Sequence, residues 1–141
     1  MVAGRLHHCY NERMTQQEAT KRWQESAVDD LGTADALFAA GKFAHCLFFC
    51  HLATEKMLKA VYTKKFDDVP PILHHLGKLW RKVEVPLGSI TEENLSEMTT
   101  FNVEARYDIF KQQLYAKATK EYTETFVHLT KEIVTWLTQY L

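Results

Sequence analysis

Apolar residues recur at spacings of three and four along most of the chain, which is the period of an amphipathic α-helix. The first such segment begins after Thr15, which forms a capping box with Glu18, and it stops before Gly41. These positions predict a helix over residues 15–40. Its apolar stripe comprises Trp23, Ala27, Leu31, Ala34, Leu37 and Phe38.

The second segment, residues 42–65, is apolar on nearly every side. A helix of this kind belongs in the centre of a bundle, where neighbouring helices cover all its faces. Pro70 and Pro71 come soon after it, and proline cannot continue a helix. A short amphipathic stretch over residues 74–83 follows and predicts a short helix.

The next helix is expected to open at Ser89 or Thr91 and to reach Phe101. Two capping boxes can open it, Ser89 with Glu92 or Thr91 with Asn94. Both pairs place a hydroxyl three residues before a side chain that can reach back to the backbone. We favour the Ser89/Glu92 pair, because glutamate is the usual partner at the third helical position of this motif.

Residues 102–114 do not define an element, whereas residues 117–140 carry a continuous helical stripe. This stripe comprises Tyr122, Phe126, Leu129, Ile133, Trp136, Leu137 and Tyr140. No segment alternates cleanly enough between apolar and polar residues to predict a strand. We therefore expect an all-α fold, an up-and-down bundle of four long helices plus one short helix.

The length of 141 residues fits one domain. Residues 1–14 lack helical periodicity and the apolar core of a signal peptide, so we expect a disordered tail there and a helical domain over residues 15–141. Met14 precedes the first helix start directly and is a candidate for the biological initiator.

Composition narrows the class of protein. Hydrophobic residues make up 46% and charged residues 25% of the chain, as in globular proteins. The net charge of −1 provides no global field that attracts nucleic acid, although a local basic patch is compatible with it. No apolar run approaches the roughly 20 residues that cross a bilayer, so we expect no membrane span.

The three cysteines favour a cytoplasmic protein, because their odd number argues against a disulfide framework. Cys46 and Cys50 are one helical turn apart and precede His51, a spacing that suits zinc. No second pair with ligand spacing accompanies them, so we interpret both thiols as core residues. We expect no metal and no cofactor.

Glu55 and Lys59 form a possible ion pair on an otherwise apolar stretch of the second helix. Exposed pairs at this spacing are common and contribute only about 0.2–0.5 kcal/mol. Here the pair is surrounded by Leu52, Ala53, Met57, Leu58, Ala60 and Val61. We expect it to be the charged edge of a site between helices.

Three motifs resemble the HEPN domain, a small all-α domain of prokaryotes and higher eukaryotes. The stretch ATEKMLKA at residues 53–60 resembles the family's A-x-E-K-x-L-K-A. LHHL at residues 73–76 resembles T-H-D-L, with His74 at the histidine position. EARYD at residues 104–108 resembles A-R-Y-P, with Asp108 in place of proline. The opening that begins at Trp23 is also similar, so the resemblance runs from about residue 15 to the C-terminus.

The resemblance implies nucleotide binding or a role directed at RNA. Many members are encoded beside a minimal nucleotidyltransferase and act with it as a toxin–antitoxin pair, and a homodimer is expected. The ribonuclease branch carries an arginine, four to six residues and then a histidine. This chain departs from that pattern, since the next histidine after Arg106 is His128. The resemblance therefore implies binding and no catalytic residue.

The resemblance also suggests the residues of the binding site: Glu55, Lys56, Lys59, His74, Arg106 and Tyr107. Lysine and arginine bind phosphate as a point charge and a planar fork respectively. Tyr107 can stack on a base. Structural alternatives stay open. Glu55 can pair with Lys59 or Arg106 and tie two helices together, Arg106 can cap a helix end, Tyr107 can lie in the core and His74 can tether a loop.

Two other functions stay open. One is a metal-independent ribonuclease that uses Arg106 as the cation and His74 as the base, brought together by folding. The other is a scaffold protein that binds no ligand.

Overall fold

The computed structural model describes residues 14–102 and 108–141, and within them every regular element is a helix. The elements are α2 (Gln16–Ala39), α3 (Phe43–Phe66), α4 (Leu76–Val83), α5 (Glu92–Thr99), α6 (Asp108–Lys117) and α7 (Lys120–Thr138). The all-α prediction is confirmed. The arrangement of four long helices and one short helix is not: α2, α3 and α7 have 24, 24 and 19 residues, whereas α4, α5 and α6 have 8, 8 and 10.

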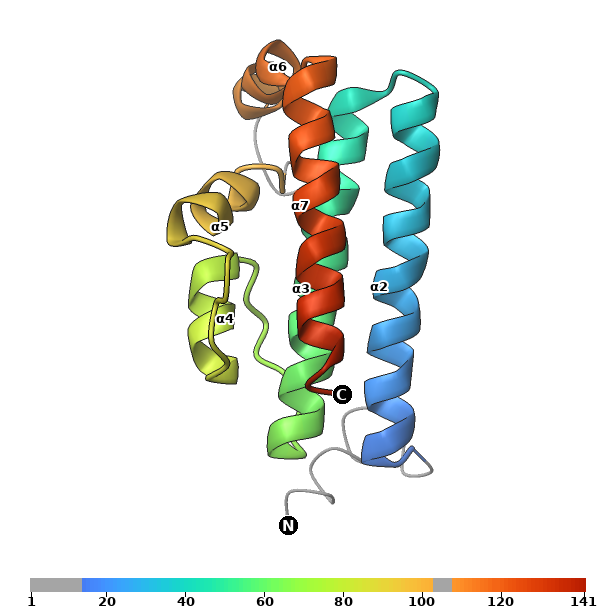
Figure 1. The fold of residues 1–141 in the computed structure, drawn as a ribbon, viewed down its shortest axis with the longest axis vertical. Coiled ribbons are helices and arrows are strands. Elements are labelled where there is room, and N and C mark those ends of the chain that lie inside the picture. The colour runs from blue at the N-terminus through green and yellow to red at the C-terminus, as the bar shows by residue number, and fades with distance from the viewer. Residues whose placement is uncertain (1–13, 103–107) are drawn as a thin grey trace.

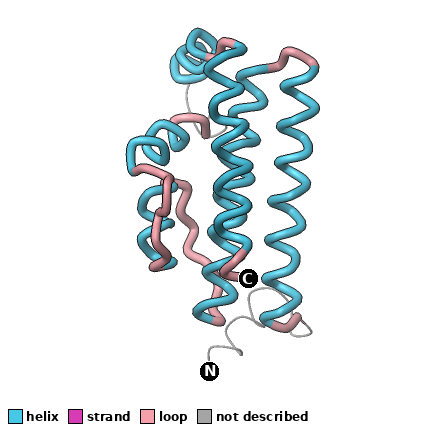
Figure 2. The backbone as a smooth tube through the Cα atoms, in the orientation of Figure 1, coloured by secondary structure: helices cyan, strands magenta, loops and turns pink. Residues whose placement is uncertain are grey.

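The three long helices pack against one another as a bundle, and the short helices α4, α5 and α6 lie along one side of it (Figure 1). α3 packs between α2 and α7 and also contacts α4, α5 and α6. α2 runs against α3, but α3 and α7 run in the same direction, because the chain returns through α4, α5 and α6. The bundle is therefore not a simple up-and-down one. Figure 2 shows the long loops that connect the short helices on this side.

The first helix begins and ends close to where its sequence signals predict. The Thr15 side chain accepts a hydrogen bond from the Glu18 backbone N–H and caps α2. Gly41 follows with a φ of 74°, a left-handed conformation that glycine adopts without strain. A tight turn then leads into α3, whose predicted central position is confirmed by the burial of most of its residues.

The start of α5 corrects our choice of capping box. Thr91 accepts from the backbone of Asn94, and the Asn94 side chain accepts from the backbone of Thr91, so this pair forms the box. The Ser89 hydroxyl instead donates to Glu132 at 2.9 Å. The tertiary contact with α7 removes Ser89 from the cap, an effect that local spacing does not contain.

The main core joins all three long helices with α4 and α5. The predicted stripe of α7 lies in it, with Ile133 and Leu137 fully buried. Phe101 is also fully buried, and its ring meets the Phe126 ring edge-on at 5.0 Å between centroids. Cys46 lies in the same core, as does Cys50, which matches the interpretation of both thiols as packing residues.

The N-terminal boundary is partly described. Residues 1–13, which make up most of the expected tail, lie outside the described residues, as does the EARY stretch at 104–107. Met14, which we had assigned to the tail, is buried together with Ala19, and Val69 packs against both. Met14 therefore contributes to the folded part of the chain.

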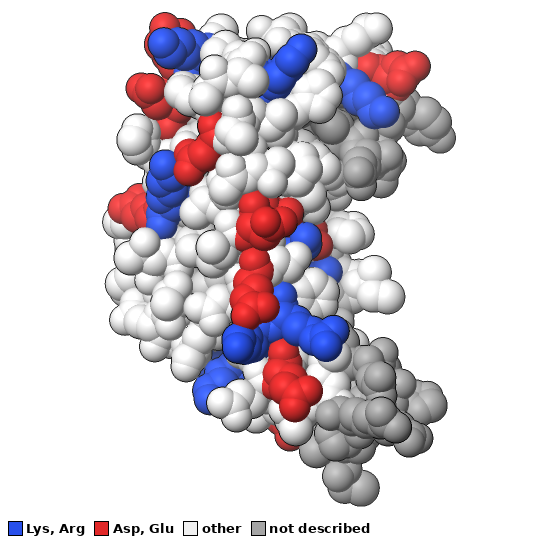
Figure 3. Space-filling view, turned by 90° about the vertical axis from the view of Figure 1, so that its right-hand side faces the viewer, with Lys and Arg blue, Asp and Glu red and all other residues white. Residues whose placement is uncertain are grey.

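Charged side chains of both signs are interspersed on the side of the molecule where α2 lies (Figure 3). This distribution fits the net charge of −1. None of the described helices is long and apolar enough to span a membrane.

Candidate functional site

Glu55 lies at the centre of a charged cluster on the buried part of α3. It is only 5% exposed, and Lys59, one turn later, is 8% exposed. The Lys59 amine donates to Glu55 Oε2 at 3.0 Å. This amine also lies 5.4 Å from the centre of the Trp23 ring on α2, a distance at which a cation is attracted to the ring face. The pair is therefore internal, unlike ordinary exposed pairs at this spacing.

His74 completes the cluster from the loop between α3 and α4. Its Nδ1 lies 2.9 Å from Glu55 Oε1. A second histidine holds this loop in place, since Nε2 of the fully buried His51 lies 3.0 Å from the His74 carbonyl oxygen and donates to it. The His74 side chain itself is 56% exposed. One imidazole thus connects a buried carboxylate to solvent.

The surroundings of Glu55 favour its ionised form. Burial raises the pKa of this carboxyl. The hydrogen bond from His74, the charge and hydrogen bond of Lys59 and the nearby His51 lower this pKa by more than burial raises it. The net pKa lies below the ordinary value of 4.5. Since an ionised carboxylate only accepts hydrogen bonds, Nδ1 of His74 carries the proton in this pair.

This arrangement defines what the cluster can do chemically. With Nδ1 occupied by Glu55, the second ring nitrogen, Nε2, is left for a ligand. It can donate to a phosphate oxygen when the ring is protonated or accept a proton when the ring is neutral. The carboxylate also offsets the charge of an imidazolium. A histidine oriented in this way suits the binding of an anion or a proton transfer.

The two lysines of the motif have different neighbours. The Lys56 amine lies 2.7 Å from Asp30 Oδ2 and 2.8 Å from the Ser26 hydroxyl, both on α2. Lys56 therefore ties α3 to α2, whereas Lys59 points its charge at Glu55. The structure brings Glu55, Lys59 and His74 together among the predicted site residues. Arg106 and Tyr107 lie outside the described residues.

The second histidine of the LHHL motif has a structural task. His75 precedes α4, and its Nδ1 accepts a hydrogen bond from the Lys78 backbone N–H at 3.2 Å. It thereby caps the helix. The helix predicted over residues 74–83 begins two residues later than expected, which leaves His74 in the loop, where it can reach Glu55.

Two contributors to this region were not assigned a part in it from the sequence. His51 was considered only as a metal ligand next to the cysteines, yet it supports the His74 backbone. Its position one turn before Glu55 was the available signal. Asp30 on α2 is the partner of Lys56, and no local spacing connects two residues of different helices. Among residues 14–102 and 108–141, no three potential ligands gather into a metal site.

The architecture and the cluster define a small all-helical domain with an oriented histidine beside a central helix. The HEPN domain family model matches residues 20–140, and the chain therefore belongs to this family. Among solved structures, the crystal structure of TT1696 from Thermus thermophilus is similar, with a TM-score of 0.69 and 20% identity over 86% of this chain and 98% of that one. At this identity the likeness concerns the fold. No curated protein matches the sequence.

Proposed function

We propose that the protein is a nucleotide- or RNA-binding module and that His74 presents the phosphate-binding group of its site. The observation that carries the proposal is the 2.9 Å contact between the half-exposed His74 ring and the buried, ionised Glu55. A carboxylate behind an imidazole fixes the orientation of the ring. A phosphate group that approaches from solvent meets the free ring nitrogen first.

Glu55 and Lys59 act behind His74 in this proposal. Both are nearly buried and already bonded to each other, so they set the position of the ring without direct contact to the ligand. Arg106 and Tyr107 are proposed to contact it directly, arginine through a bidentate grip on phosphate and tyrosine by stacking on a base. We leave Lys56 outside the site because its amine is bonded to Asp30 and Ser26.

The family membership motivates two further parts of the proposal: the module forms a homodimer, and it acts with a separate minimal nucleotidyltransferase as a toxin–antitoxin pair. The cysteines motivate a third part, that the protein works in the cytoplasm. Sedimentation of the purified protein tests the dimer. Co-purification of the module with a nucleotidyltransferase encoded beside it tests the partner.

Ligand-induced thermal stabilisation tests the binding proposal. A ligand at 100 times its dissociation constant adds about 2.7 kcal/mol to the free energy of unfolding. We expect a nucleotide or short RNA to raise the melting temperature of the native protein and not that of His74→Ala or Arg106→Ala. Lys78→Gln, which changes an exposed lysine on α4, serves as the control and keeps the shift. No shift with any nucleotide or RNA would contradict the proposal and favour a ligand-free scaffold.

A metal-independent ribonuclease is the second candidate, and the same Glu55–His74 pair favours it. An imidazole held by a carboxylate is an effective general base, and Arg106 would stabilise the charge on the phosphate. The family's arginine–histidine ribonuclease spacing is absent from this sequence. RNA cleavage that persists in chelator and is lost in His74→Ala would establish this function.

A further inference from the structure

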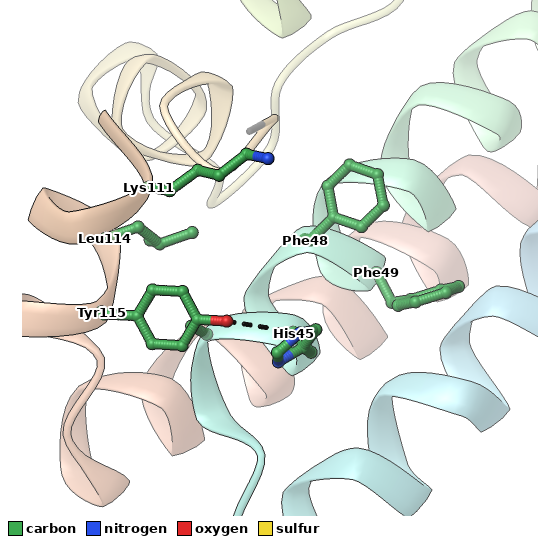
Figure 4. A pocket seen from close by; sticks show the side chains of 7 residues that line it. His45, Phe48, Phe49, Lys111, Leu114 and Tyr115 are labelled. Atoms are coloured by element: carbon green, nitrogen blue, oxygen red, sulfur yellow. Dashed lines mark hydrogen bonds between the residues drawn. The ribbon is translucent and has the colours of Figure 1, made fainter. Parts of the chain in front are cut away.

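A cavity of about 340 Å³ lies between α3 and α6, away from the charged cluster. Each helix lines it with residues at positions i, i+3 and i+4, which share one helix face. α3 contributes His45, Phe48 and Phe49, and α6 contributes Lys111, Leu114 and Tyr115. Figure 4 shows the three α6 side chains projecting toward His45 and Phe48. The volume lies in the range of small-molecule sites, about 300–1,000 Å³.

The walls of the cavity suit a flat ring. Phe48, Phe49 and Tyr115 provide aromatic surface, and Leu114, which is 2% exposed, closes the inner end. The rings of His45 and Tyr115 pack edge-to-face, with their planes at 80° and their centroids 5.8 Å apart. The Tyr115 hydroxyl lies 3.3 Å from His45 Nε2. Aromatic rings pack favourably against such walls in stacked or edge-to-face geometry.

One charge at the cavity has no partner in the described structure. Within residues 14–102 and 108–141, the Lys111 amine makes no ion pair and no hydrogen bond. The other described cations in the protein interior are satisfied, as Lys59 is by Glu55 and Lys56 by Asp30. Lys111 is half-buried, and a charge beside apolar walls attracts an anion more strongly than a charge fully surrounded by water.

α6 is anchored well enough to keep this wall in place. Leu114 is buried, and the Lys117 amine donates to Glu97 and to the Thr100 hydroxyl, each at 3.1 Å. The Tyr122 hydroxyl of α7 also donates to Glu97. The cavity is therefore preformed, which limits the ordering cost that a ligand would incur on binding.

We propose that the cavity between α3 and α6 binds a small aromatic carboxylate, with its ring against Phe48 and Tyr115 and its carboxylate on the Lys111 amine. Phe48 precedes Glu55 by seven residues, two helical turns, so the cavity and the charged cluster lie roughly 10 Å apart along α3. The site is separate from the proposed phosphate site and does not depend on it.

Three probe molecules test the ring contact and the charge contact separately. 1-Naphthoate carries both the ring and the charge, 1-naphthalenemethanol carries the ring alone, and acetate carries the charge alone. We expect naphthoate to bind the full chain about tenfold more tightly than the neutral alcohol, since the alcohol carries no negative charge to pair with the Lys111 amine. Acetate is expected to bind more weakly than either. Amide resonances of residues 45–49 and 111–115 should shift with naphthoate.

Variants then assign each interaction to a residue. Lys111→Gln should weaken naphthoate about tenfold and leave the alcohol unchanged. Phe48→Leu should weaken both, while Lys78→Gln on α4 should change neither. Equal affinities of naphthoate and the alcohol, or naphthoate binding insensitive to Lys111→Gln, would overturn the proposal. Displacement of naphthoate by a tighter-binding adenosine monophosphate would also overturn it and assign the cavity to a nucleobase.

Discussion

Two regions on the same face of α3 differ in whether their charged side chains are paired. Around Glu55 the carboxylate, Lys59 and His74 are bonded to one another, and only the histidine ring reaches solvent. Around Phe48, two turns earlier, α6 leaves a cavity, and Lys111 at its edge has no partner within the described residues. One region uses charge to hold the fold and orient a single group. The other leaves charge and apolar surface available to a ligand.

The difference follows from what covers α3 at each place. A loop lies over Glu55 and delivers a polar ring directly to it, so the buried carboxylate is compensated. A short helix lies over Phe48 and contributes a long lysine side chain, which cannot pair with the apolar wall it faces. Burial of a charge is tolerated only with partners, so folding should be sensitive to substitution of Glu55 and tolerant of substitution of Lys111.

The largest effect is expected from Glu55→Ala. Removal of the carboxylate leaves Lys59, whose side chain is 10% exposed, without its charge partner. Breaking a buried pair in this way costs about 3–5 kcal/mol of folding stability. Urea unfolding measures the cost. Glu92→Ala, which removes an ion pair with Arg81 at 51% and 63% side-chain exposure, is the control and should cost about 1 kcal/mol or less. If Glu55→Ala and Glu92→Ala lost equal folding stability, the buried pair would contribute no more than the exposed one, which would contradict this prediction.

Leu114→Ala tests how firmly α6 covers the cavity. Leu114 is 2% exposed, and truncation of a buried leucine costs about 2–5 kcal/mol. The variant should also lose naphthoate affinity, because the inner end of the cavity opens. Ile109→Ala, at a position 60% exposed on the same helix, is the matched control and should change neither quantity appreciably. A stable Leu114→Ala variant would mean that α6 is not packed as described.

The Glu55 region should also make the folding stability of the protein depend on pH. The pKa of Glu55 is lower in the folded protein than its ordinary value of 4.5. A depressed pKa contributes stability above the unfolded value, and this contribution is lost as pH falls through the folded value. Glu55→Gln should therefore lose less stability than the native protein between about pH 5 and pH 3. Denaturant unfolding at a series of pH values tests this, with Glu92→Gln controlling for removal of one carboxylate.

Lys111→Gln should have the smallest effect on folding. The amine has no described partner to lose, and substitutions of this kind usually change stability by about 0.5 kcal/mol or less. Thermal unfolding of the variant measures this. A large destabilisation would show that Lys111 has a structural role and would weaken the case for a ligand at the cavity.

Local signals predicted every described helix except α6, because residues 102–114 showed no clear helical stripe although Asp108–Lys117 forms a helix. Tertiary contacts decided most of the rest. Thr15 and Gly41 mark the ends of α2 because caps and left-handed turns act within a few residues. The choice between Ser89 and Thr91 failed because Ser89 bonds to Glu132, far along the chain. The relative directions of the helices could not be predicted from the sequence either. Three short helices carry the chain back along the bundle, so that α7 runs parallel to α3.

The candidate site divides in the same way. The Glu55–Lys59 pair could be predicted from its spacing on one helix. His74 entered through the family resemblance, and its contact with Glu55 depends on a loop whose course periodicity does not describe. The cavity was not predictable at all, because His45 and Tyr115 meet only when α6 folds over α3.

In the proposed site, a ligand phosphate contacts the His74 ring, which Glu55 holds in place. The most direct measurement follows the imidazole NMR signals of His74, assigned by their loss in His74→Gln, while a nucleotide or short RNA is titrated into the native protein. We expect a saturable shift of these signals, and a weaker one in Glu55→Gln, where the ring loses its anionic partner. Saturable binding that leaves the His74 signals unmoved would contradict it.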